Sequence, residues 1–142
     1  MTFLSVNQWI NSIGTDPLAT LNAYTSGITS TARVSTFAAT ATRGSVVTLG
    51  KRTPIRLLFG TGWVSTAVQV RPYLSEDNVT FRPAYDRYGS AITISAVAGR
   101  SVELGADDLK SVAYLRLLGT QATGTVAAQA TACTVTVVAR LI

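Results

Sequence analysis

In the stretch ACTVTVVARL, residues 132–141, threonine and valine alternate from Thr134 to Val137. In an extended chain Val135 and Val137 fall on one side, and Thr134 and Thr136 fall on the other. β-Branched residues of this kind favour pleated strands. The stretch therefore predicts a strand that buries one face in a core and leaves small or hydroxylated side chains on the other.

The same alternation recurs in the chain from about residue 32 onward. Glycine-rich turn signals interrupt it roughly every ten residues, a spacing typical of β-sandwiches. The chain has 142 residues, a common size for one domain with one core. We expect a mainly β fold, a single antiparallel, jelly-roll-like β-sandwich over residues 31–142. The candidate strands are 33–42, 45–49, 54–59, 63–74, 80–83, 91–96, 101–104, 114–118 and 132–141.

Residues 1–30 have a different pattern and are expected to form a short helical or extended N-terminal arm. Val6, Trp9, Ile10 and Ile13 recur with helical spacing, and Gly14 is a natural stop. Helices this short need a surface to pack on. That surface is either the chain's own sandwich or a neighbouring subunit, and the sequence leaves both open.

The charges are separated along the chain. The net charge is +5, and no acid lies between residues 17 and 75. This separation suits a basic face that meets an acidic neighbour, although charges distant in sequence also pair within one fold. Basic residues are spread thinly, with no run longer than Lys51–Arg52, so direct nucleic-acid binding is not expected. The candidate partner-binding residues are Phe3, Trp9, Ile10, Arg33, Arg43, Lys51, Arg52 and Arg56.

Residues that carry out catalysis are scarce. The chain has no histidine, which removes the commonest general base and most zinc sites. Cys133 is the single cysteine, so it can form no intrachain disulfide and has no imidazole to activate it. We expect no enzyme activity, no catalytic or metal site and no cofactor. The N-terminus lacks signal-peptide features and no long apolar run occurs, so we expect a soluble protein without membrane contact.

The segment YLSEDNVTFRP, residues 73–83, is followed by YGS at 88–90 and YLRL at 114–117. Together they resemble a pattern common in virion proteins of tailed bacteriophages, over roughly residues 63–118. The resemblance implies a capsid cement or decoration protein with a jelly-roll-like sandwich, made in the bacterial host cytoplasm. It would bind the major capsid protein on the capsid surface, stabilise the contacts between capsid subunits, and bind itself as a homodimer or homotrimer.

Two other functions stay open at this point. One is another virion component, such as a head-tail connector, a tail part or a fibre module, which patterning does not distinguish from a cement protein. The other is a glycan-binding β-sandwich in which Trp63, Tyr73, Tyr85 and Tyr88 stack against sugar rings. In a sandwich most aromatic side chains belong to the core, so this hypothesis requires exposed rings.

Overall fold

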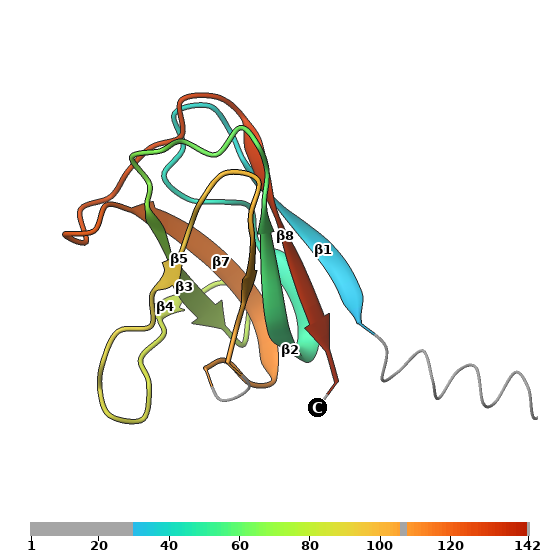
Figure 1. Cartoon of the computed structure of the whole chain (residues 1–142). Coiled ribbons are helices and arrows are strands. Elements are labelled where there is room, and N and C mark those ends of the chain that lie inside the picture. Colours follow the sequence, from blue (N-terminus) through green and yellow to red (C-terminus); the bar gives the residue numbers. More distant parts are fainter. Residues whose placement is uncertain (1–29, 106–107, 142) are drawn as a thin grey trace, which may run out of the picture.

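The computed structural model describes residues 30–105 and 108–141, which form eight strands and no helix (Figure 1). The prediction of a single antiparallel β-sandwich is confirmed. Most of the predicted arm, residues 1–29, lies outside the described residues. The strands are β1 Thr31–Phe37, β2 Val47–Phe59, β3 Gln69–Ser75, β4 Arg82–Pro83, β5 Ile94–Ser95, β6 Ser101–Glu103, β7 Val112–Thr120 and β8 Cys133–Arg140. In the described part of the chain no helix is long and apolar enough to cross a membrane.

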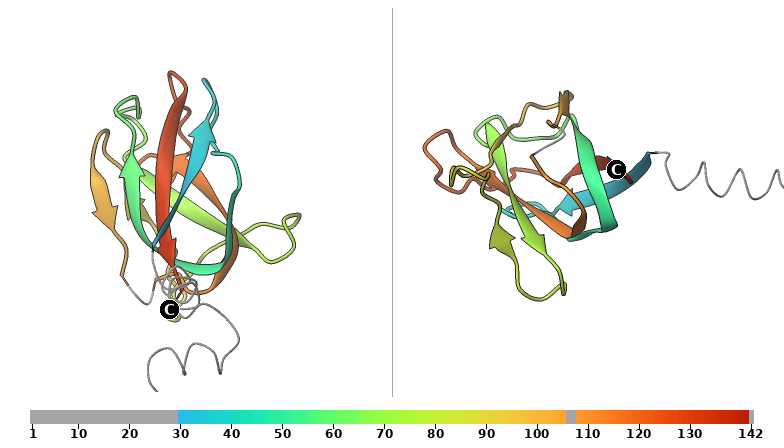
Figure 2. Two further views of the ribbon diagram at one scale, coloured as in Figure 1. Left: turned by 90° about the vertical axis from the view of Figure 1, so that its right-hand side faces the viewer. Right: turned by 90° about the horizontal axis from the view of Figure 1, so that it is seen from below.

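The strands form one hydrogen-bonded path that folds into two layers (Figure 2). Sheet A contains β1, β8, the second part of β2, and β6. Sheet B contains the first part of β2, then β7 and β3, with β4 and β5 both pairing with β3. All of these pairings are antiparallel, and the apolar faces of the two sheets meet in the core.

Strand β2 belongs to both sheets because it bends in its middle. The sequence predicts two strands, 45–49 and 54–59, separated by a turn at Gly50. The structure instead has one strand with a register shift, in which Gly50 and Lys51 have φ of 59° and 66°. Such a bulge bends a strand without ending it. The glycine that signals a turn in the sequence therefore marks the point where the chain passes from sheet B to sheet A.

The core lies between the sheets and is closed at one end by aromatic rings. Trp63 packs edge-on against Phe37 and Phe59, with ring centroids 5.0 and 5.1 Å apart. Trp63 is 4% exposed. The fully buried aliphatic side chains around the rings come from both sheets and include Leu49, Leu57, Val70, Leu115, Leu117, Val135 and Val137.

Several predicted strands are shorter in the structure than the alternation in the sequence suggests, among them 80–83 and 91–96, of which only Arg82–Pro83 and Ile94–Ser95 form strands. The strand predicted at 63–74 begins only at Gln69, because the preceding loop is held by local hydrogen bonds. The Trp63 backbone N–H donates to the Gly60 carbonyl at 3.2 Å, and the Trp63 indole donates to the Ala67 carbonyl at 2.7 Å. The strand predicted at 33–42 ends at Phe37, where the chain turns away from the sheet.

Gln129 joins three loops at the same end of the sandwich. Its backbone accepts a hydrogen bond from the Thr40 N–H and donates one to the Ala41 carbonyl. Its side-chain Oε1 accepts hydrogen bonds from the Val64 N–H at 2.9 Å and from the Cys133 thiol at 3.3 Å. Burial raises the pKa of that thiol. Gln129 is 1% exposed, so these bonds are shielded from water.

Candidate binding face

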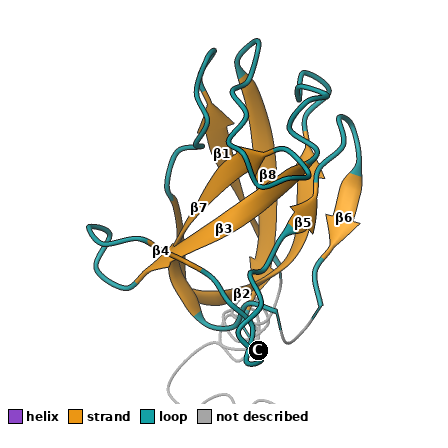
Figure 3. Ribbon diagram, turned by 90° about the vertical axis from the view of Figure 1, so that its left-hand side faces the viewer, coloured by secondary structure: helices purple, strands orange, loops and turns teal. Residues whose placement is uncertain are grey.

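Strands β3 and β7 lie side by side in sheet B (Figure 3), and their register places arginine and tyrosine residues on the outer face of this sheet. Tyr73 on β3 lies opposite Arg116 on β7, and Arg71 lies opposite Leu118. Directly opposed residues of antiparallel strands project from the same face of a sheet. The intervening Pro72 is buried, whereas Arg71, Tyr73 and Arg116 are partly exposed. The register therefore gathers these three side chains on one surface.

Arg43 reaches this surface from the loop before β2. Its backbone forms a bridge with Leu118, and its guanidinium carbon lies 5.9 Å from the centroid of the Tyr73 ring. A guanidinium over an aromatic face is an attractive cation–π arrangement. On the other side, the Nε–H of Arg116 donates to the Gly44 carbonyl at 3.0 Å. Both arginines are thus held beside Tyr73 by contacts within the fold.

A small hollow opens between these two arginines. It has a volume of about 80 Å³ and is lined by Arg43, Tyr73, Phe81, Arg116, Leu117 and Leu118. We call it the arginine hollow. It has room for a few water molecules or for one small polar group of a ligand, but not for a whole sugar ring.

A projecting hairpin, residues 84–91, lies beside this face and is the yellow loop below β4 and β5 in Figure 1. The Asp86 carboxylate accepts hydrogen bonds from the backbone N–H groups of Tyr88 at 2.8 Å and Ser90 at 2.9 Å. The Asp86 N–H donates to the Ser90 carbonyl at 2.8 Å, and Gly89 adopts φ of 85°. Asp86 therefore fixes the tip of the hairpin.

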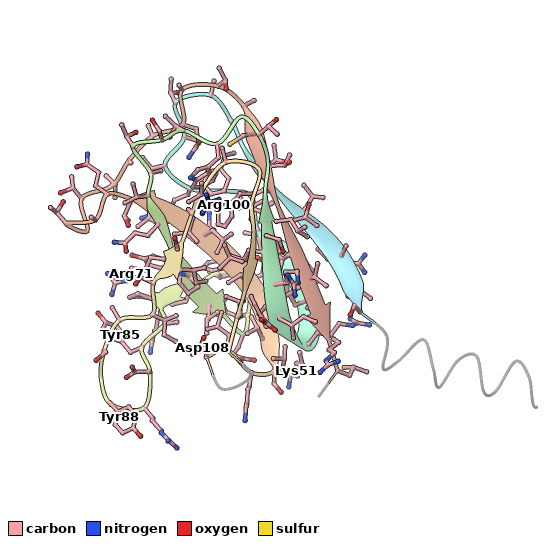
Figure 4. The ribbon with its side chains drawn as sticks, viewed as in Figure 1. Lys51, Arg71, Tyr85, Tyr88, Arg100 and Asp108 are labelled. Atoms are coloured by element: carbon pink, nitrogen blue, oxygen red, sulfur yellow. The ribbon has the colours of Figure 1, made fainter. Side chains whose placement is uncertain are left out.

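The hairpin presents two tyrosine rings to solvent. Tyr88 at its tip is 79% exposed and Tyr85 is 55% exposed. Arg71 donates from Nη2 to the Tyr85 hydroxyl at 2.9 Å, and its guanidinium carbon lies 5.3 Å from that ring's centroid. The guanidinium carbon of Arg87 lies 5.0 Å from the Tyr88 ring centroid. In Figure 4, Arg71, Tyr85 and Tyr88 follow one another from the sheet to the tip.

No carboxylate among the described residues neutralises the arginines of this face. Arg43, Arg71 and Arg116 form no ion pair with any described residue. Glu76 and Asp77 belong to the β3–β4 turn and line a separate hollow of about 350 Å³ with Leu74 and Arg82.

Asp77 has a structural role in that turn. Its carboxylate accepts hydrogen bonds from the N–H groups of Thr80 and Val79 and from the Ser75 hydroxyl. These bonds favour the charged form and lower the pKa of Asp77 to about 2. Asn78 beside it has φ of 61°, a conformation that suits the tight turn between β3 and β4.

A further hollow, of about 300 Å³, lies between the loop before β3 and the segment after β5. Its lining is mainly apolar and includes Val64, Val68, Ala96 and Val97. It offers no charged side chain to a ligand.

The structure does not bring the predicted partner-binding residues onto one face. Phe3, Trp9 and Ile10 lie outside the described residues. Arg33 pairs with Val137 and Arg56 with Val138, and because successive residues of a strand alternate, these arginines project from opposite faces of sheet A. Lys51 and Arg52 lie at the bend of β2, with the Arg52 guanidinium donating to the Leu49 carbonyl at 3.2 Å. Arg43 alone reaches the outer face of sheet B.

The four aromatic residues considered for sugar stacking divide into two groups. Trp63 is buried in the core and also contributes to the lining of the apolar hollow near Val68 and Val97, away from the outer face of sheet B. Tyr73, Tyr85 and Tyr88 all lie on or beside the outer face of sheet B. Arg116 is not among the site residues predicted from the sequence. The alternation in YLRL predicts that its side chain points outward, but its position beside Tyr73 depends on the register of β3 and β7.

No protein-family model matches the chain, and no curated protein sequence matches it. Among solved structures, the chain is similar to the carbohydrate-binding module CBM32-1 from a family 31 glycoside hydrolase from Clostridium perfringens. The two are 19% identical, with a TM-score of 0.41, over 72% of this chain and 75% of the module.

Proposed function

We propose that this chain is a non-catalytic β-sandwich that binds carbohydrate through the outer face of sheet B and the 84–91 hairpin. The observation that carries the proposal is the exposure of Tyr85 and Tyr88 on a hairpin that Asp86 holds in one shape. A flat ring offers an apolar face to the C–H face of a sugar. The hydroxyl and guanidinium groups beside it supply hydrogen bonds to sugar hydroxyls.

The rigidity of the hairpin supports this function energetically. Binding costs free energy when loops and side chains must be ordered at the interface, and pre-organisation lowers that cost. The contacts of Asp86 with the backbone, and of Arg71 with Tyr85, order the hairpin before a ligand arrives. An exposed ring held in this way is suited to recognition rather than to packing.

The proposed absence of catalysis rests on the chemistry of the side chains. The sequence contains no histidine to transfer protons at neutral pH. The Cys133 thiol is buried, and burial raises its pKa, so that it stays protonated and unreactive. We expect bound glycans to be recovered unchanged.

Binding to a glycan array tests the proposal. Replacing Tyr88 with Ala is expected to weaken binding of the strongest array glycan by about tenfold, as loss of an aromatic anchor does, and adding Tyr85→Ala is expected to weaken it further. Val79→Ala is the matched control, because Val79 is 81% exposed in the neighbouring turn. An array without binding, or tyrosine variants that bind like Val79→Ala, would refute the function.

A virion decoration protein is a second candidate, and the open edge of β1 favours it. β1 pairs with β8 on one side; on its other side Ser45 of the following loop hydrogen-bonds with Thr36, and no described strand pairs with the rest of that edge. An open edge can add a strand from another chain, such as a major capsid protein or a second copy. Residues 73–83, part of the pattern that resembles phage virion proteins, form a strand, a turn and a short second strand.

Imaging of a purified particle tests this candidate. A cement protein is expected in hundreds of copies over the capsid surface, each with β1 against a neighbouring chain. A connector or tail component is expected in about six or twelve copies, and absence from particles would exclude a virion role.

A further inference from the structure

We infer that the arginine hollow binds the carboxylate of an acidic sugar, so that the carbohydrate recognised by this chain is anionic. The inference rests on the proposed function and specifies its ligand. Uronic and sialic acids carry such a carboxylate on the sugar ring. The hollow then binds the acid group of the glycan, and the hairpin binds an apolar face of one of its sugar rings.

The two arginines leave hydrogen-bonding capacity free for a ligand. The Arg43 guanidinium contacts the Tyr73 ring and donates no hydrogen bond to a described residue. Arg116 uses its Nε–H on the Gly44 carbonyl, which fixes the side chain and leaves its Nη groups for another acceptor. Guanidinium groups offer a planar fork of donors that matches the two oxygens of a carboxylate.

The charge at the hollow is uncompensated. Both arginines line the same 80 Å³ space, and no described carboxylate pairs with either. Positive charges that share a partly buried site raise each other's energy, because the local dielectric constant is lower than that of water. A bound anion removes this repulsion, whereas a neutral sugar hydroxyl does not.

The dimensions of the hollow indicate which part of a sugar enters it. A volume of about 80 Å³ holds a carboxylate but not a pyranose ring, so the ring stays outside. The wall of the hollow is partly aromatic, from Tyr73 and Phe81, and Leu117 and Leu118 add aliphatic surface to it. Two charged donors in a partly apolar, partly buried setting favour an ionic acceptor.

The hollow and the hairpin belong to one continuous surface. Tyr73 lines the hollow, and Arg71 lies two residues earlier on the same face of β3, about 7 Å away along a strand. Arg71 in turn contacts Tyr85 of the hairpin. A short oligosaccharide whose acid group enters the hollow therefore extends toward Tyr85 and Tyr88.

The test uses the full chain on an array that pairs uronic- and sialic-acid glycans with the same glycans reduced at the carboxylate to an alcohol. Reduction is expected to weaken binding at least tenfold. Arg43→Gln is expected to weaken binding of the carboxylated glycan tenfold and to weaken binding of its reduced partner much less, because the alcohol forms no ion pair with Arg43. Arg33→Gln removes the same charge from an exposed site on β1 and is expected to change neither.

The remaining outcomes distinguish a failure of the carboxylate assignment from a failure of the proposed function. Binding of neutral glycans alone would overturn the carboxylate assignment and leave carbohydrate binding intact. Stronger binding of sulfated than of carboxylated glycans, or equal losses for Arg43→Gln and Arg33→Gln, would show general attraction of anions and overturn it as well. Binding to no glycan would refute the proposed function itself. Thermal unfolding of both variants checks that each is folded.

Discussion

Replacing Phe37 with Ala is expected to lower the free energy of unfolding by about 3–5 kcal/mol, the range measured for removal of a buried phenyl ring. Phe37 has no exposed surface and packs edge-on against Trp63, which in turn contacts Phe59. Truncation removes one of three rings and opens a cavity that the rigid strands around it cannot fill. Chemical denaturation of wild type and variant measures the loss.

Val34→Ala is the control for this prediction. Val34 lies on β1 with Phe37 but is 53% exposed, so the change is expected to stay within about 0.5 kcal/mol. Because the two residues share a strand, the comparison separates core packing from strand propensity. Equal losses for the two variants would show that the core is not where the structure places it.

Replacing Gln129 with Glu is expected to destabilise the protein by about 3 kcal/mol or more at pH 7, because a carboxylate of similar shape then occupies a site that is 1% exposed. Only the Val64 N–H and the Cys133 thiol donate to this position, and no described cation contacts it. The Gln129 Nε2 group is itself buried without a partner, so the site supplies no further hydrogen bond. Two donors do not replace the hydration of a charge.

The destabilisation is expected to depend on pH with a defined sign. Burial raises the folded-state pKa of the introduced carboxyl group above its unfolded value of about 4.3. The folded state therefore prefers the protonated form, and stability present below about pH 4 is lost as the pH rises through the folded pKa. The melting temperature of the variant, measured from pH 4 to pH 8 and compared with wild type, follows this loss.

Gln121→Glu is the matched substitution at an exposed position of the same loop. Its melting temperature is expected to follow that of wild type across the pH range. A Gln129→Glu variant that behaves in the same way would mean that Gln129 is accessible to water, and that the three loops are not closed over it.

Much of the fold could be predicted from local patterns. The alternation in residues 132–141 corresponds to β8, in which Val135 and Val137 pack inward as expected. The union of two predicted strands into β2 could not be predicted, because a glycine with positive φ serves a turn and a bulge equally well. The same holds for 63–68, where alternation favours a strand but the indole hydrogen bond of Trp63 closes a loop.

The candidate binding face was only partly predictable from the sequence, because its residues come together only through the pairing of β3 with β7. Tyr73, Tyr85 and Tyr88 are recognisable as candidates from the sequence because an exposed aromatic ring can stack against a sugar ring. Their grouping with Arg43 and Arg116 depends on the pairing of β3 with β7 and on the bridge between Arg43 and Leu118. Contacts between residues distant in sequence are not encoded in the local pattern. The arginines predicted from charge separation alone therefore lie on several surfaces, and only Arg43 among them belongs to this face.

Chemical-shift mapping by NMR tests the binding face most directly, with the full isotope-labelled chain and the carboxylated glycan that binds most tightly on the array. The account predicts that shifts concentrate in the hairpin at 84–91, along β3 and β7, and at the side-chain N–H signals of Arg43 and Arg116. Shifts confined to sheet A or to the apolar hollow around Val68 and Val97 would contradict it.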